Sequence, residues 1–154
     1  MRFLSVLLVS FASMLLLNTT FAQSISVTRD IDFGLGVVVD NDAQHEIVIA
    51  PGGGFTSDPE FIFINQPLSG VYRLTGAAPS QTIDSVVITV DQQLLGGGQQ
   101  FTIDNFSVNF PAQTDLAGEA TITLGARLRT TGTGVFYVPS TVFSGLLTME
   151  VTLL

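Results

Sequence analysis

The sequence has 154 residues, no cysteine and a formal net charge of −8, which arises from 5 basic and 13 acidic residues. The absence of cysteine excludes disulfides, thiol catalysis and cysteine metal sites. The negative charge argues against nucleic acid and anionic lipid as partners. Because the acidic residues are scattered along the chain, we attribute this charge to solubility.

The chain begins with the layout of a secretory signal peptide. Arg2 precedes an apolar run over residues 3–17, and the small residues Thr20 and Ala22 stand two apart before Gln23. This pattern predicts export and cleavage before Gln23. A membrane-spanning helix is the alternative, but it needs about 20 apolar residues and a charged flank to stop its transfer.

We therefore predict two regions, a signal peptide over residues 1–22 and a single β-sandwich domain over residues 23–154. The mature form is expected not to span a membrane. It is expected in the periplasm, on the outer cell surface or in the medium.

Alternation of apolar and polar residues predicts β-strands that have one face in solvent. The alternation is clearest in residues 85–90, 119–129 and 147–153. Shorter apolar runs predict further strands at residues 24–28, 37–39, 45–49, 61–64 and 71–74. Within residues 101–110 the apolar positions change from odd to even, which predicts a β-bulge near Asp104 and Asn105.

Turn-forming residues separate these strands, and no segment after residue 23 keeps a helical apolar period for three turns. The turns are expected at residues 40–42, 51–54, 76–79, 96–98 and 130–134. About eight or nine short strands in one domain predict an all-β fold, an antiparallel immunoglobulin-like (Greek-key) β-sandwich. A closed barrel is the alternative.

The residues that could support catalysis are few. His45 is the only histidine and has no nucleophile beside it in the sequence, so we predict an ordinary strand residue. Paired carboxylates can act as acid and base in glycoside hydrolysis, but aspartate is also common in turns because it caps backbone amides. The pairs are Asp30 with Asp32, Asp40 with Asp42, and Asp58 with Glu60.

We assign no catalytic, cofactor-binding or metal-binding residue and expect neither a cofactor nor enzyme activity. Asp40-Asn41-Asp42 is the best candidate for a calcium loop, but it lacks EF-hand spacing, and we interpret it as a turn. The glycine triplets at residues 52–54 and 96–98 lack the lysine of a phosphate loop. The absence of tryptophan weighs lightly against carbohydrate binding.

Several short segments occur in an order typical of one bacterial family. They are Ile25-Ser26-Val27 followed by Ile31-Asp32-Phe33-Gly34, Ile47-Val48-Ile49-Ala50-Pro51, Tyr72-Arg73-Leu74-Thr75-Gly76, Leu124-Gly125-Ala126-Arg127-Leu128, and Ser144-Gly145 before the last alternating strand. In this order they resemble the secreted family known as domain of unknown function 4402.

The resemblance implies a β-sandwich similar to fimbrial major subunits of the Mat/Ecp kind and, more distantly, to spore-coat-U-type pilins, with no catalytic residues. We therefore expect a fimbrial-like structural or adhesive subunit that assembles by strand-edge contacts with like subunits or other surface proteins. The alternative is a self-contained exported module that binds carbohydrate or depends on calcium. Because Ile25 and Val27 lie only a few residues before Asp32, the N-terminal arm is too short to complete a neighbour's sheet as well as its own.

The first prediction concerns maturation. The exported protein should begin at Gln23, because Thr20 and Ala22 occupy the two positions before the cleavage site that must hold small residues. Intact-mass measurement of the exported protein tests this. Retention of residues 1–22 would contradict it.

Overall fold

The structure, a computed structural model, describes residues 23–138 and 140–154. The signal peptide that we predict for residues 1–22 therefore lies outside the described residues. All regular structure within the described part is antiparallel β-strand, so the prediction of an all-β antiparallel sandwich is confirmed. No helix in this part is long and apolar enough to cross a membrane.

The described residues form ten strands. They are β1 (Ser24–Arg29), β2 (Leu35–Val38), β3 (Glu46–Ile49), β4 (Phe55–Ser57), β5 (Phe61–Asn65), β6 (Gly70–Thr75), β7 (Ile83–Gly96), β8 (Gln99–Asn109), β9 (Ala120–Arg129) and β10 (Ser144–Leu153). The main sheet has the order β1-β6-β9-β8-β7-β10; in addition, β3 pairs with β9, and β4 pairs with β3. Strands β2 and β5 pair separately as a two-stranded ribbon.

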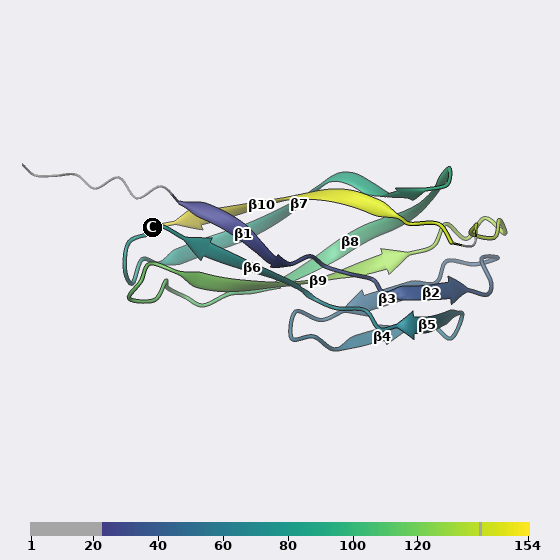
Figure 1. The fold of residues 1–154 in the computed structure, drawn as a ribbon, viewed down its shortest axis with the longest axis horizontal. Helices are drawn as coiled ribbons and strands as arrows, with labels where there is room; N and C mark the ends of the chain where they lie inside the picture. Colours follow the sequence, from purple (N-terminus) through teal and green to yellow (C-terminus); the bar gives the residue numbers. More distant parts are fainter. Residues whose placement is uncertain (1–22, 139) are drawn as a thin grey trace, which may run out of the picture.

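The main sheet curls on itself without closing (Figure 1). The order β6-β9-β8-β7 is a Greek key, because three consecutive strands are followed in space by the strand that precedes them in the chain. Within the described residues β1 pairs only with β6, and β10 pairs only with β7. A closed barrel, the alternative to a sandwich, is therefore not formed.

Strand β9 lies at the centre of the sheet. Its alternating apolar side chains are all buried: Ala120, Ile122, Leu124, Ala126 and Leu128. One side of β9 pairs with β8. The other side pairs first with β6 and then, after Gly125, with β3. The change of partner falls at a glycine because the backbone of β3 approaches closely there.

Two apolar clusters fill the interior. The first lies between β6 and β9 on one side and β7 and β10 on the other, where Leu147, Met149, Val151 and Leu153 cover buried Ile122. The second contains Ile47, Ile49, Phe101 and Leu128, together with aromatic side chains from β4, β5 and the segment before β10. The predicted inward face of the terminal strand is thus confirmed.

The β-bulge predicted in β8 is also confirmed. The register with β9 shifts between Asp104 and Ser107, and Asn105 has a φ of 49°. This left-handed conformation is one that asparagine adopts more readily than most residues. The bulge explains why the apolar positions of β8 change parity.

Two strands differ from the prediction. Strand β7 continues past Val90 through polar residues, where Gln92 pairs with Leu146 of β10. In the same stretch the Gln93 side chain accepts a hydrogen bond from Ile103 N–H and donates one to Ile103 O. The backbone pairing of β7 with β8 ends at Leu94 and Phe101. Just beyond this pair, the Gln93 side-chain amide takes the place of a backbone hydrogen-bond partner. Strand β4, which has three residues, was not predicted. It pairs with β3 across the predicted turn at residues 51–54.

The second prediction tests the close approach of β3 to β9 at Gly125, where β9 changes its partner from β6 to β3. A Cβ atom there would lie 2.2 Å from Ile49 O and 2.8 Å from Pro51 N, so Gly125→Ala should lower the free energy of unfolding by about 1–3 kcal/mol. Gly54→Ala is the matched control, because its Cβ would meet nothing within 4 Å. Urea unfolding measures both. Equal midpoints for Gly125→Ala and the unmodified protein would contradict the close approach.

Candidate functional site

His45 stands directly before β3, where backbone and side-chain hydrogen bonds hold it in place. Its N–H donates to Thr130 Oγ1 at 2.9 Å, and its carbonyl oxygen accepts from Thr130 N–H at 2.9 Å. These bonds extend the pairing of β3 with β9 by one position beyond Glu46 and Arg129. The backbone of His45 is therefore bonded to the end of β9, although β3 itself begins at Glu46, one residue later than predicted.

Asp58 and Glu60 lie in the turn between β4 and β5. Asp58 Oδ2 accepts a hydrogen bond from Glu46 N–H at 2.8 Å, and Asp58 N–H donates to Glu46 O at 3.0 Å. The carbonyl oxygen of Glu60 accepts from Val39 N–H at 2.9 Å. The turn is thus fixed to β3 on one side and to the end of β2 on the other.

These two segments bring His45, Asp58 and Glu60 into one cluster. His45 Nδ1 lies 3.1 Å from Glu60 Oε2 and 3.7 Å from Asp58 Oδ2. The His45 side chain is 13% exposed, Glu60 27% and Asp58 41%. The other ring nitrogen, Nε2, is buried without a hydrogen-bond partner. The cluster offers one nitrogen and two carboxylate oxygens to a cation.

An ion-pair network lies next to this cluster. Asp104 accepts hydrogen bonds from Arg127 Nε at 2.8 Å and from Arg129, and Arg127 Nη1 is 3.3 Å from Glu46 Oε2. The hydrogen bond from Arg127, followed by that from Arg129, holds the pKa of Asp104 below its usual value. Arg127 and Arg129 thus form ion pairs with acids other than Asp58. In the described part of the chain no arginine pairs with Asp58.

The other candidate carboxylates make turn contacts. Asp32 Oδ1 accepts a hydrogen bond from Gly34 N–H, and Asp40 Oδ1 accepts one from Asp42 N–H. These are the local bonds that favour aspartate in turns. Buried Asn41 donates to Val135 O and accepts from Gly132 N–H. Its side chain therefore serves to hold a neighbouring loop.

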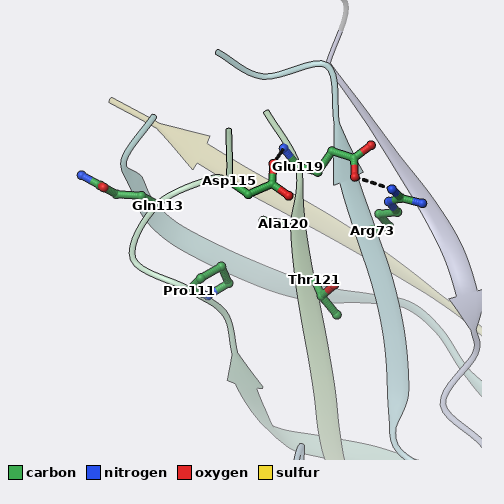
Figure 2. A pocket seen from close by; sticks show the side chains of 7 residues that line it. All are labelled: Arg73, Pro111, Gln113, Asp115, Glu119, Ala120 and Thr121. Atoms are coloured by element: carbon green, nitrogen blue, oxygen red, sulfur yellow. Dashed lines mark hydrogen bonds and ion pairs between the residues drawn. The ribbon is translucent and has the colours of Figure 1, made fainter. Parts of the chain in front are cut away.

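An open depression of about 410 Å³ lies at one end of β6 and β9 (Figure 2). Arg73 in this depression is paired with Glu119. Asp115 Oδ1 accepts hydrogen bonds from the N–H groups of Ala117 and Glu119. The charged groups thus bond to one another and to the nearby loop, which leaves few polar groups for a ligand.

Two kinds of surface are open to other proteins. The outer edges of β1 and β10 are unpaired within the described residues. In addition, five aliphatic side chains on the outward face of the β2–β5 ribbon are between 47 and 70% exposed; we name this surface the ribbon face. Its members are Leu35, Val37, Val39, Ile62 and Ile64. Exposed apolar patches of this kind are common at contact sites.

Comparison of the chain with protein-family models, with curated proteins and with solved structures gave no match.

The third prediction concerns the ion-pair network. Asp104→Asn should lower the free energy of unfolding by about 1 kcal/mol at pH 7. Because folding depresses the pKa of Asp104, its stabilising contribution is present at neutral pH and is lost as the pH falls below about 4. The difference between variant and parent should therefore shrink in acid. Urea unfolding at several pH values measures it.

Asp84→Asn is the matched control, since Asp84 is exposed and lies outside the ion pairs of the described residues. This change removes the same charge without touching the network. A loss for Asp104→Asn that is the same at pH 7 and at about pH 3 would contradict the assigned role.

Proposed function

We propose that the protein is an exported, non-catalytic structural or adhesive subunit, joined to like subunits or other surface proteins by strand-edge contacts. One observation carries this proposal: the first and the last strand of the described residues, β1 and β10, are the two ends of the six-strand order of the main sheet. An unpaired edge presents a row of N–H and C=O groups that can accept a further strand.

The edge of β10 is the better candidate for the joining surface. Strand β1 has six residues, starts at Ser24 next to the predicted cleavage position, and pairs with β6 along one side. Strand β10 has ten residues and pairs with β7 along one side. Its long free edge would allow many backbone hydrogen bonds to form at once, which favours slow dissociation of a subunit.

Two further features support the proposal. The ribbon face provides an apolar surface suited to adhesion or to a second subunit contact. The predicted signal peptide and the resemblance to fimbrial subunits are consistent with a role at the cell surface.

A ligand-binding module is the second candidate, and the cluster of His45, Asp58 and Glu60 is the observation that favours it. Such a module would bind its ligand as a monomer. The oligomeric state of the protein in its native setting therefore distinguishes assembly from ligand binding.

The fourth prediction is that heat-labile, SDS-resistant ladders or filaments that contain this protein can be recovered from the native cell surface. Immunoblotting of heated and unheated samples, with negative-stain microscopy, measures this. A strictly monomeric protein that binds a small ligand saturably would overturn the proposal in favour of the ligand-binding module.

A matched pair of variants tests which edge is used. Leu146→Lys places a charge on β10 at a side chain that is 57% exposed, whereas Leu116→Lys makes the same change in a loop at a side chain that is 86% exposed. Charge on an edge strand hinders edge pairing. We expect fewer ladders for Leu146→Lys alone, with similar melting temperatures for both variants. An equal loss of ladders in both variants would exclude the β10 edge as the joining surface.

A further inference from the structure

We propose that His45, Asp58 and Glu60 form a binding site for a divalent transition-metal ion, with zinc as the best fit. Zinc ligands at roughly 2.0–2.2 Å from the metal in a tetrahedron lie roughly 3.3–3.6 Å from one another. The distances from His45 Nδ1 to the two carboxylate oxygens, 3.1 and 3.7 Å, lie on either side of this range. The three donor atoms lie within 4.8 Å of one another, so small side-chain rotations bring them to a common centre.

The donor set selects among cations. Imidazole nitrogen is a good ligand for zinc and similar metals, whereas calcium takes six to eight oxygens and magnesium keeps an octahedral oxygen shell. This cluster supplies one imidazole and two carboxylates. Three protein ligands leave the fourth tetrahedral position to water or to an external group. The site is therefore predicted to prefer zinc to calcium.

The surroundings of the cluster favour a bound cation. Two carboxylates that converge on one point repel each other unless a positive charge lies between them. Within the described residues the only basic group paired with Asp58 or Glu60 is His45 itself, because Arg127 and Arg129 are bound to Asp104. His45 Nδ1 and Asp58 Oδ2 are 3.7 Å apart, which is too far for a hydrogen bond. The imidazole therefore cannot form direct hydrogen bonds to both carboxylates.

The backbone prepares this geometry before a metal binds. Glu46 N–H donates to Asp58 Oδ2 and so orients that carboxylate, as supporting groups do around metal ligands. Thr130 fixes the backbone of His45 on both its N–H and C=O sides. A metal here would link the start of β3 to the β4–β5 turn and stabilise the folded state by mass action.

The site can be tested directly because His45 is the only histidine and the chain has no cysteine. The purified protein, free of any polyhistidine tag, is labelled with ¹⁵N and titrated with zinc while the imidazole resonances are recorded. We expect a shift of the Nδ1 resonance that saturates at one equivalent, and a higher melting temperature. Calcium at the same concentration should change neither.

Variants separate the metal site from a simple ion pair. His45→Gln and Glu60→Gln should each weaken zinc binding, measured by calorimetry, by at least about tenfold. Asp84→Asn, which removes one exposed acid elsewhere, should leave the affinity unchanged. Melting curves without zinc establish that each variant is folded.

Three outcomes would overturn the proposal: no imidazole shift at tenfold zinc excess, an equal shift with calcium, or full affinity in a folded His45→Gln variant. None of these outcomes bears on strand-edge assembly, which is measured separately at the cell surface.

Discussion

The fold depends on the pairing of β9 with three other strands. This strand bonds to β8 along one side and to β6 and then β3 along the other, and its apolar side chains contribute to both core clusters. The chain has no cysteine, so no disulfide can replace these contacts. Close approach at Gly125 is what allows the two strands to share one side of β9. The half that contains β6 and the half that contains β3 are therefore held together by one continuous strand.

Much of the fold could be predicted because alternation reports directly on burial. The alternation in residues 119–129 and 147–153 predicts one buried face for β9 and for β10, and the change of parity near Asn105 predicts the bulge in β8. The extension of β7 could not be found in this way. It involves pairing with the start of β10 and the Gln93 side-chain amide, which bonds to the backbone of β8. These contacts leave no periodic pattern in the sequence.

The cluster at His45 was missed for a related reason. Strand β4 has only three residues, too few to show alternation. Once β4 is known, its register with β3 pairs Ile47 with Ser57. Continuing that register places His45 opposite the turn that holds Asp58 and Glu60. The three proposed metal ligands are therefore brought together only by strand pairing, since His45 is separated from Asp58 and Glu60 in the sequence.

The proposed metal site and the proposed assembly edges lie on different parts of the fold, and their physical requirements differ. An assembly edge must leave backbone groups unpaired, as β1 and β10 do among residues 23–138 and 140–154. A metal site needs side chains whose backbone is already fixed, and the turn at Glu60 is bonded to β2 through Val39. Because the same turn leads into β5, a metal bound there would hold the ribbon against the second core cluster. The ribbon face would then be presented on a rigid support, while the edge of β10 stays free to pair.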